Sequence, residues 1–485
     1  APNRQGVSAW LKDNSGFYYS SYAPVEKGQE LKQATKFQKV YFHKLGTPQS
    51  EDYVVYERPD NGDYFSGAEI SEDGKWLLIT VGKGTERMNM VYFKNLTMEK
   101  APFIPLIENL ENSWNFLGND GSTFYFQTDK DAPRGRIVSR NVLDRSMIWK
   151  EIVPQSADTM GNVSFINNQF VLNYLKDAAT AIKIVNTDGS FVRDVKLPGI
   201  GSAGGFGGKR TDSETFYTYS SFATPPTIYR YDMKTGESKM FRTAGVKMDP
   251  SKYEVKQVFY NSKDGTKVPM FLTYKKGIKL DGKNPTLLYG YGGFNISQTP
   301  GFSVGRIAWL DMGGVYAVAC IRGGAEYGKD WWRGGSRLNK QNTFDDFAWA
   351  GKWLIENKYT STPKLAIQGG SNGGLLVGAV LNQNPGLFGA AIPQVGVMDM
   401  IRFDKFTIGW AWRSDYGDPT NAEDFKVMYA YSPYHNAKVG TKYPPTLVTT
   451  ADHDDRVHPA HSFKYTAAMQ YAQAGDAPIM IRVQV

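Results

Sequence analysis

Short runs of aromatic and β-branched residues, separated by turn residues, recur through the first half of the chain. Five of these runs begin at Phe17, Trp76, Phe124, Phe170 and Phe216, 46 to 59 residues apart. Each is followed by a second apolar run that ends in a turn, as "FYFQTD" is followed by "IVSRNVLD". Such runs favour strands, and a period of about 40–50 residues is typical of β-propeller blades. The pattern predicts five blades, and the even spacing argues against a plain β-sandwich, which is the alternative.

From about residue 250 the pattern changes to nearly continuous apolar runs separated by amphipathic segments. Continuous runs suit strands of a parallel sheet that is buried on both faces. Phe344, Phe347 and Leu354 recur at helical spacing, and Thr343 is placed to cap that helix. Strands that alternate with helices predict an α/β domain over residues 251–485, after a propeller domain over residues 1–250. The predicted strands are 285–293, 313–321, 364–370, 390–395 and 445–452.

Composition narrows the classes of function. The chain has 485 residues, 41% of them hydrophobic and 21% charged, which is typical of a globular protein of two or three domains. The net charge is +8, but the basic residues are scattered, so no nucleic-acid partner is expected. No run of about 18 apolar residues exists, so no membrane partner is expected. The single Cys320, in "VYAVACI", is interpreted as a buried thiol that leaves the compartment open between cytoplasm and bacterial periplasm.

A glycine-rich segment, "GSAGGFGGKR" at 201–210, resembles a phosphate-binding loop at first sight. The P-loop pattern needs a glycine six residues before its lysine and Ser or Thr after it, and Ala203 and Arg210 occupy those places. The segment is therefore interpreted as a connection between blades.

Ser371 stands among four glycines in "LAIQGGSNGGLLVG" at 365–378. The flanking apolar runs predict a strand before the serine and a helix after it. A nucleophile elbow has this form, because side chains next to the serine would collide with the sheet or the helix. The turn also directs the backbone N–H of Asn372 at the reacting oxygen. The alternative is an inert glycine-rich turn.

The other members of a catalytic triad are sought in the order Ser, then Asp or Glu, then His. Asp452, Asp454 and Asp455 follow the predicted strand at 445–452, and spacing alone does not choose among them. A base is expected on a loop after the next strand, "PIMIRVQV", with which the chain ends at Val485. None of the five histidines has that place, and they are His43, His435, His453, His458 and His461.

Six linked motifs in the second half together resemble the prolyl oligopeptidase family of serine peptidases. They are "YGYGGFNIS", "IRGGAEYG", "GGSNGGLLV", "QVGVMDM", "IGWAWRSDYG" and "TADHDDRVHPAHSFK". The resemblance is dense from about residue 250 onward and looser through the first half. It implies an α/β-hydrolase catalytic domain with an N-terminal β-propeller. One departure is Ala325, where the family has a third glycine.

The resemblance implies a role for each matching residue. Ser371 would be the nucleophile and Asp454 the acid of the triad. The backbone N–H of Asn372 and the hydroxyl of Tyr291 would form the oxyanion hole, and Arg456 would bind a substrate carbonyl beside the scissile proline. The proline slot would be lined by Trp412, Tyr416, Phe294, Val397, Ile408 and Val457.

The activity implied is that of a serine endopeptidase which cleaves short, proline-containing oligopeptides after proline through an acyl-enzyme. No metal and no cofactor are implied, and a monomer is expected. The alternatives are a sister oligopeptidase or acylaminoacyl peptidase with another specificity, an esterase, and a catalytically dead peptide-binding protein. A slot for basic residues would need carboxylates, and "IGWAWRSDYG" supplies only Asp415.

The resemblance also bears on how much of the protein this sequence represents. Family members have seven blades and an N-terminal segment before them, and they continue past the last strand into a histidine-bearing loop. The expectation is therefore a longer protein, with the propeller incomplete on its N-terminal side and the C-terminal part of the hydrolase domain missing. The base would then be a histidine about five residues beyond Val485, and the 485 residues alone would be nearly inactive.

Overall fold

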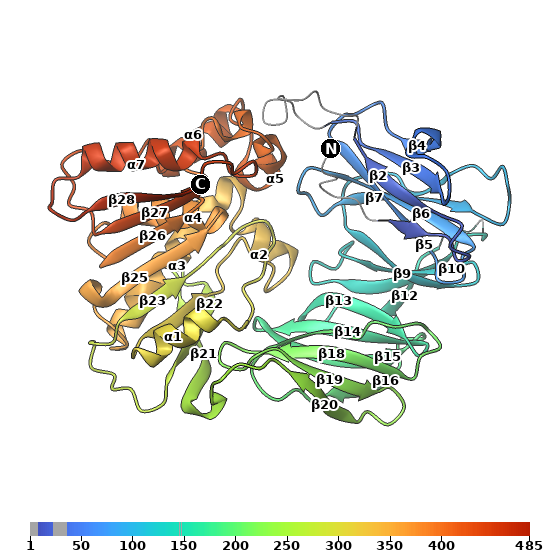
Figure 1. Cartoon of the computed structure of the whole chain (residues 1–485), viewed down its shortest axis with the longest axis horizontal. Helices are drawn as coiled ribbons and strands as arrows, with labels where there is room; N and C mark the ends of the chain where they lie inside the picture. Colours follow the sequence, from blue (N-terminus) through green and yellow to red (C-terminus); the bar gives the residue numbers. More distant parts are fainter. Residues whose placement is uncertain (1–7, 23–35, 145, 147) are drawn as a thin grey trace. The chain divides into compact units, whose positions relative to one another are not determined.

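The structure, a computed structural model, describes residues 8–22, 36–144, 146 and 148–485 (Figure 1). It divides into two compact units, Ala1–Ser156 with Thr187–Gly189 and Ala157–Asn186 with Ser190–Val485. Within the described residues, five four-stranded sheets follow one another along the chain, and one eight-stranded sheet comes after them.

The first unit contains three antiparallel four-stranded sheets, each formed by strands that pair in chain order. A 3₁₀ helix, Gln49–Glu51, precedes the last strand of the first sheet. The first sheet comprises β1 (Ala9–Trp10), β2 (Gly16–Ser21), β3 (Lys39–Lys44) and β4 (Tyr53–Glu57). The second comprises β5 (Tyr64–Ile70), β6 (Trp76–Lys83), β7 (Asn89–Asn95) and β8 (Ile104–Ile107). The third comprises β9 (Trp114–Asp120), β10 (Thr123–Thr128), β11 (Arg136–Asn141) and β12 (Lys150–Val153).

The second unit begins with two further sheets of the same kind. One comprises β13 (Thr159–Ile166), β14 (Gln169–Lys176), β15 (Ala179–Asn186) and β16 (Phe191–Val195). The other comprises β17 (Ser202–Gly205), β18 (Glu214–Ser220), β19 (Thr227–Asp232) and β20 (Ser238–Thr243). The prediction of five blade-like repeats is thus confirmed, with four antiparallel strands in each.

The aromatic runs that revealed the repeat form the second strand of every sheet, β2, β6, β10, β14 and β18. The following apolar runs form the third strand. These two strands are central in their sheets and have a hydrogen-bonded neighbour on each side, so β-branched and aromatic residues fill them. Phe124 and Phe170 are fully buried. The first and fourth strands lie at the sheet edges and carry weaker patterns.

The interpretation of residues 201–210 as a connection was wrong, because Ser202–Gly205 is β17, the first strand of the fifth sheet. It pairs with β18 from Ser202 opposite Ser220 to Gly205 opposite Tyr217. A Cβ at Gly201 would lie 2.4 Å from the Tyr219 ring, and one at Gly205 would lie 2.8 Å from a backbone oxygen of β18. Gly201 and Gly205 are therefore needed for close packing against β18, whereas a Cβ at Gly204 would meet nothing within 4 Å.

The eight-stranded sheet of the second unit has the order β21-β22-β24-β23-β25-β26-β27-β28. An antiparallel hairpin, β21 (Tyr253–Asn261) and β22 (Lys267–Lys275), precedes six parallel strands and was not predicted. Strand β22 is buried on both faces and β21 is mostly half-buried, so neither strand shows the alternation that marks an exposed hairpin. The parallel strands are β23 (Thr286–Tyr289), β24 (Val315–Ala319), β25 (Leu365–Gly370), β26 (Ala390–Gln394), β27 (Thr446–Ala451) and β28 (Ile479–Gln484).

Helices cover this sheet on both faces (Figure 1). The core that contains Leu288, Ile367 and Val448 includes buried side chains of α3, α4 and α7. On the opposite face, Ile307 and Leu310 of α1 pack with Tyr316 and Val318. The helices are α1 (Val304–Asp311), α2 (Lys329–Arg333), α3 (Lys340–Glu356), α4 (Asn372–Gln383), α5 (Arg413–Tyr416), α6 (Ala422–Tyr431) and α7 (Ala460–Ala472). Short 3₁₀ helices lie at Pro250–Lys252, Arg337–Asn339, Thr362–Lys364, Phe403–Lys405 and Gly409–Trp412.

The prediction that Thr343 caps a helix was wrong by one turn. Helix α3 begins at Lys340, so Thr343 lies inside it and is fully buried. Its hydroxyl donates to the backbone oxygens of Arg322 (2.9 Å) and Gly335 (3.0 Å). The side chain therefore bonds the loop before α3, and not the helix's own N–H groups. The prediction that Cys320 is buried is confirmed.

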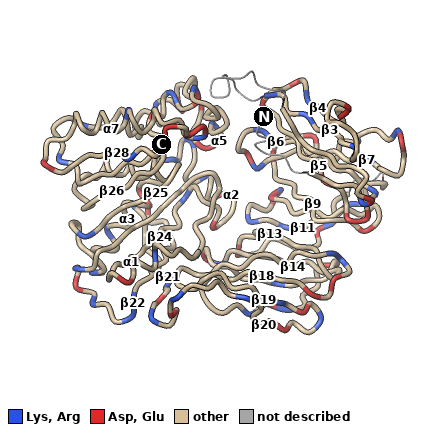
Figure 2. Tube along the Cα trace, in the orientation of Figure 1, with Lys and Arg blue, Asp and Glu red and all other residues tan. Residues whose placement is uncertain are grey.

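Charged positions of both signs are interspersed along the blades and the eight-stranded sheet (Figure 2). Within the described residues, no helix has the length and apolar character required to cross a membrane.

Candidate active site

Ser371 occupies a sharp turn between strand β25 and helix α4. Its backbone has φ 56° and ψ −117°, a conformation that residues with a Cβ rarely adopt. Its N–H donates to the backbone oxygen of Gln394 in the neighbouring strand (2.9 Å), and its carbonyl accepts the first bonds of α4 from Gly374 and Leu375. The strained residue is therefore fixed on both sides, as a nucleophile elbow requires.

The glycines around Ser371 do not all serve the same purpose. A Cβ at Gly369 would lie 2.3 Å from the Gly373 carbonyl oxygen, and one at Gly373 would lie 2.7 Å from that of Gly290. A Cβ at Gly374 would lie 2.6 Å from the Gln394 carbonyl oxygen. Gly370 differs, because a Cβ there would meet nothing within 4 Å. Close packing of strand against helix thus demands three of the four glycines.

Tyr291 follows strand β23 and lies near Ser371. Burial raises the pKa of its phenol to about 12, and the negative charge of Asp415 adds to the rise. A hydrogen bond with Ser371 and the positive charge of Arg456 act in the opposite direction. The structure therefore brings Tyr291, Ser371 and Arg456 together, and it keeps the phenol in its protonated, hydrogen-donating form near neutral pH.

The side chain of Asn372 connects the elbow to its surroundings. Its Nδ2 donates to the backbone oxygen of Tyr291 (2.5 Å), and its Oδ1 accepts from the Tyr416 hydroxyl (3.1 Å). It is almost fully buried. As the first residue of α4, Asn372 also carries one of the N–H groups that have no acceptor within a helix. The amide side chain thus positions the Tyr291 loop beside that helix N-terminus.

The loop after β27 contains the three candidate acids. Asp454 Oδ1 accepts from the backbone N–H groups of Arg456 (3.0 Å) and Val457 (2.9 Å), which folds the loop around its carboxylate. Asp452 Oδ1 lies 2.7 Å from His453 Nδ1, and His453 is exposed. Asp454 is half-buried, with its second oxygen not engaged in these loop bonds.

Among the described residues, no recorded contact joins a histidine to Ser371 or Asp454. His458 Nδ1 accepts from the N–H of Ala460 (3.1 Å), and its ring stacks on Phe406. His461 is buried, and its Nδ1 accepts from the N–H of Asp399 (3.1 Å). Burial lowers the pKa of His461 to about 3. His435 lies beside Ser432, and His43 beside Asp52 in the first unit.

The residues expected around the proline slot all belong to, or pack against, the large hydrophobic core of the second unit. Trp412, Tyr416, Val397 and Val457 are buried, whereas Phe294 and Ile408 are half-buried. The Tyr416 ring meets Phe294 edge-on, with centroids 5.4 Å apart. Tyr416 is only 1% exposed, and its hydroxyl bonds Asn372. Of these two rings, Phe294 is therefore the one closer to solvent. Arg456 is exposed.

A buried ion pair that the sequence did not reveal lies beneath this group. Lys340 Nζ and Asp415 Oδ2 are 2.8 Å apart, and their side chains are 0% and 1% exposed. In the sequence Asp415 is the single acid of its motif, and Lys340 stands near a helix start, where lysine is usually exposed. Sequence patterns do not predict that Lys340 pairs with Asp415, because the two residues are 75 positions apart in the chain.

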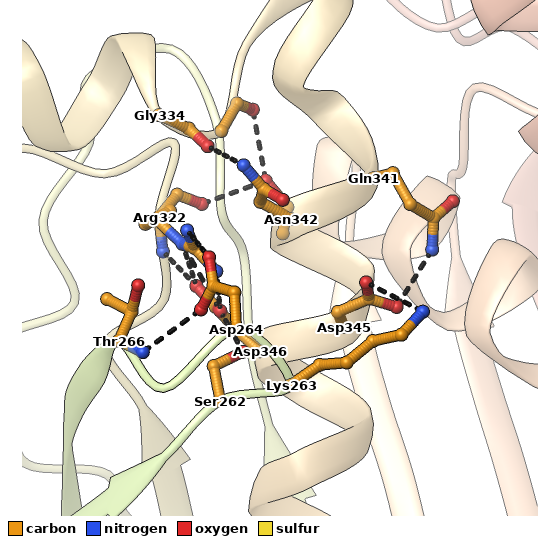
Figure 3. Close-up of polar contacts among 12 residues, drawn as sticks. Ser262, Lys263, Asp264, Thr266, Arg322, Gly334, Gln341, Asn342, Asp345 and Asp346 are labelled. Carbon is orange, nitrogen blue, oxygen red and sulfur yellow. Dashed lines mark hydrogen bonds and ion pairs between the residues drawn. The ribbon is translucent and has the colours of Figure 1, made fainter.

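A second polar cluster joins the hairpin β21–β22 to helix α3 (Figure 3). The Arg322 guanidinium binds both oxygens of the buried Asp346, and its Nη1 donates to Asp264 (2.6 Å). The pKa of Asp264 falls to about 2 because of Arg322. Arg322 comes from "IRGGAEYG", whereas Asp264 lies in the turn of the hairpin and Asp346 in α3, so the cluster joins three segments.

Comparison with known proteins places this arrangement in a family. Residues 2–244 match the profile of the prolyl oligopeptidase N-terminal β-propeller domain, and residues 300–484 match that of the prolyl oligopeptidase family. A prolyl endopeptidase of Elizabethkingia meningoseptica is 44% identical over 481 residues, which are 99% of this chain and 68% of that protein.

Solved structures of family members also match nearly the whole chain. One from an analysis of two prolyl endopeptidases is 41% identical with a TM-score of 0.94, and the match covers 99% of this chain and 70% of that one. Prolyl oligopeptidase B of Galerina marginata, bound to a 35mer hydrolysis and macrocyclization substrate as a serine-to-alanine variant, is 35% identical with a TM-score of 0.95. That match covers 100% of this chain and 68% of the relative. The chain belongs to the prolyl oligopeptidase family of serine peptidases, with a β-propeller N-terminal to an α/β-hydrolase domain.

Proposed function

We propose that this protein is a serine endopeptidase that hydrolyses short peptides on the carboxyl side of proline. The observation that carries the proposal is the elbow at Ser371, with its φ of 56°, beside the protonated Tyr291 phenol. Family membership supports the same activity, since prolyl endopeptidases of 44% and 45% identity match nearly the whole chain. We retain residues 1–250 as the propeller domain and 251–485 as the peptidase domain.

The reaction begins when Ser371 Oγ attacks the carbonyl carbon of the proline residue and gives its proton to a base. The tetrahedral intermediate collapses, the C–N bond breaks, and the leaving amine takes up that proton. Water then hydrolyses the acyl-enzyme by the same sequence of steps and restores Ser371.

The oxyanion of the tetrahedral intermediate is stabilised by the Tyr291 hydroxyl and the Asn372 N–H. Both donors are held before substrate arrives, because the Asn372 side chain bonds the Tyr291 carbonyl oxygen. Preorganised donors in a buried site contribute more than they would in water. The exposed Arg456, whose charge acts on Tyr291, binds a carbonyl oxygen of the substrate.

The slot around Phe294 and Trp412 receives the pyrrolidine ring, which offers apolar area and no N–H. Asp415 does not make it a slot for basic residues, because Lys340 already neutralises that carboxylate at 2.8 Å. This pairing favours proline over the specificity of a sister oligopeptidase that cleaves after Lys or Arg.

The acid of the triad is Asp454, whose loop follows strand β27 as the order of the triad requires. Solved relatives from Galerina marginata hold their substrates as serine-, histidine- and aspartate-to-alanine variants, which supports a triad of these three residue types. The identity of the histidine stays a prediction.

Hydrolysis of three matched chromogenic peptides that end in Pro, Arg and Ala tests the proposal. We expect kcat/KM for the Pro peptide to exceed the other two by at least about a hundredfold. Preference for Arg would indicate a sister oligopeptidase. Binding of the Pro peptide without turnover would indicate a peptide-binding protein, and hydrolysis of simple esters alone would indicate an esterase.

A further inference from the structure

The buried pair Lys340–Asp415 reaches the candidate site through three further hydrogen bonds. Lys340 Nζ donates to the backbone oxygen of Gly292 (3.0 Å). Asp415 Oδ1 accepts from the N–H of Phe294 (2.8 Å) and from Trp332 Nε1 (2.9 Å). The two charges therefore hold a donor and an acceptor of the backbone that directly follows Tyr291.

This stretch of backbone needs such support, because its conformation is unfavourable by itself. Gly292 has φ 65° and Phe294 has φ 56°, and the left-handed region is costly for a phenylalanine. Asn295 also has a positive φ, of 55°. A strained turn persists only where its surroundings determine it. The ion pair supplies two of these contacts, beside the bond from Asn372 to Tyr291 and that from the Asn295 N–H to the Gly323 carbonyl oxygen.

The pair also organises the aromatic side of the slot. The Lys340 ammonium lies 5.4 Å from the centroid of the Tyr416 ring, and Tyr416 meets Phe294 edge-on. Tyr416 in turn donates to Asn372, whose side chain bonds Tyr291. The pair is thus connected to the proposed oxyanion donor Tyr291 through the backbone that follows it, and to the proposed slot through Tyr416 and Phe294.

We propose that the buried Lys340–Asp415 pair positions the Tyr291–Phe294 turn. By doing so it fixes the place of the oxyanion donor Tyr291 and determines the preference for proline. Neither residue touches the substrate. This inference rests on the proposed function, since it concerns the selectivity of the same site.

A role in stability alone must be separated from a role in positioning. Either single substitution to an uncharged residue leaves a buried charge unpaired and can unfold the protein. We therefore compare two double variants without charge, Lys340→Met/Asp415→Asn and Lys340→Met/Asp415→Leu. Asn and Leu have similar size, but only Asn retains an oxygen that can accept from the Phe294 N–H and Trp332.

Both double variants are made in the full-length protein and assayed with the Pro and Ala peptides, and their Tm is measured. We expect Tm values within about 5 °C of each other. The Asn variant should keep its Pro-to-Ala ratio of kcat/KM within about threefold of wild type. The Leu variant should lose at least about tenfold of that ratio, with a lower kcat for Pro, because the turn loses its acceptor.

Equal ratios in two folded double variants would overturn the proposal. Asp346→Asn is the matched control, because Asp346 is equally buried and paired with Arg322 but bonds Ser262 and the hairpin side (Figure 3). It should lower Tm without changing the Pro-to-Ala ratio, and a tenfold loss of ratio there would also count against a specific role of Lys340–Asp415. Failure of the wild-type protein to prefer Pro over Ala would instead refute the proposed function.

Discussion

Ser371, the proposed nucleophile, has an unfavourable backbone conformation. Glycine tolerates φ 56° without the steric cost that Ser and Ala share. We therefore expect Ser371→Ala and Ser371→Gly both to abolish turnover of the Pro peptide, with different effects on stability. The Gly variant should be more stable than the Ala variant by about 1 kcal/mol, as measured by urea denaturation.

Equal stability of these two variants would show that the elbow is not strained. Retention of more than a tenth of wild-type activity in either one would remove Ser371 from the role of nucleophile.

Tyr291 is expected to act as a neutral donor over the whole working range of pH. With its pKa raised to about 12, the phenol stays protonated up to about pH 11. Tyr291→Phe should lower kcat by about 10²–10³-fold with little change in KM, because the bond is strongest to the oxyanion. Parallel pH profiles of wild type and variant up to pH 10 are expected, and a wild-type activity loss near pH 9 that is absent in Tyr291→Phe would contradict this assignment.

At the scale of single residues, the sequence predicts those candidate site residues that stand in a recognisable local motif. Ser371 and the acids after β27 could be found from spacing, and Tyr291 and Arg456 from a resemblance. Lys340 could not, because its partner Asp415 is 75 positions away and its role depends on three-dimensional burial. The same holds for Asn372, whose backbone was predicted to matter but whose side chain also links two loops.

At the scale of elements, the turn between β25 and α4 predicts different outcomes for two identical substitutions. Gly373→Ala would place a Cβ 2.7 Å from a backbone oxygen, whereas Gly370→Ala would meet open space. We expect Gly373→Ala to lower the free energy of unfolding by about 1–3 kcal/mol. Gly370→Ala should leave it unchanged or raise it by a few tenths of a kcal/mol, because alanine restricts the unfolded chain. Comparable losses in urea denaturation of both variants would refute this reading of the turn.

Helix α7 is attached to the loop after β26 by a neutral histidine, and that attachment predicts a dependence on pH. Burial lowers the pKa of His461 to about 3, from 6.5 in the unfolded chain. Between these values the unfolded chain binds a proton that the folded chain excludes, so stability is complete above pH 6.5 and falls as the pH falls. His461→Asn keeps an acceptor for the Asp399 N–H but cannot titrate. Its Tm should therefore fall less than that of wild type between pH 7 and pH 5, and parallel curves would contradict the prediction.

Elements were predictable where burial makes several consecutive or alternating positions of a strand apolar. All five central aromatic strands and all six parallel strands follow from apolar runs. Strand β17 was missed because packing against Tyr219 selects glycines, which also mark loops. The start of α3 was misplaced because Thr343 bonds a distant loop instead of capping, a contact that only tertiary structure creates.

At the scale of the whole molecule, the family relationship predicts a limit on the substrate. The Galerina marginata relative is bound to a 35mer hydrolysis and macrocyclization substrate. We expect the protein to cleave a proline peptide of about this length, and to leave a proline in a loop of a native globular protein intact. Mass spectrometry of the two digests checks this, with the unfolded form of the same globular protein as the positive control. Rapid cleavage of the native form would contradict the prediction.

The order of strands in the sheets has a consequence for synthesis on the ribosome. Each four-stranded sheet pairs its strands in chain order, so it can form as soon as its own residues, about 45, have emerged. Strand β23 cannot do so, because its neighbours are β24 and β25, which are made later. The turn that begins at Tyr291 must wait longer still, until Lys340 and Asp415 have been translated. The nascent enzyme therefore assembles its propeller blades first, and the turn that carries the proposed oxyanion donor is among the last parts to be fixed.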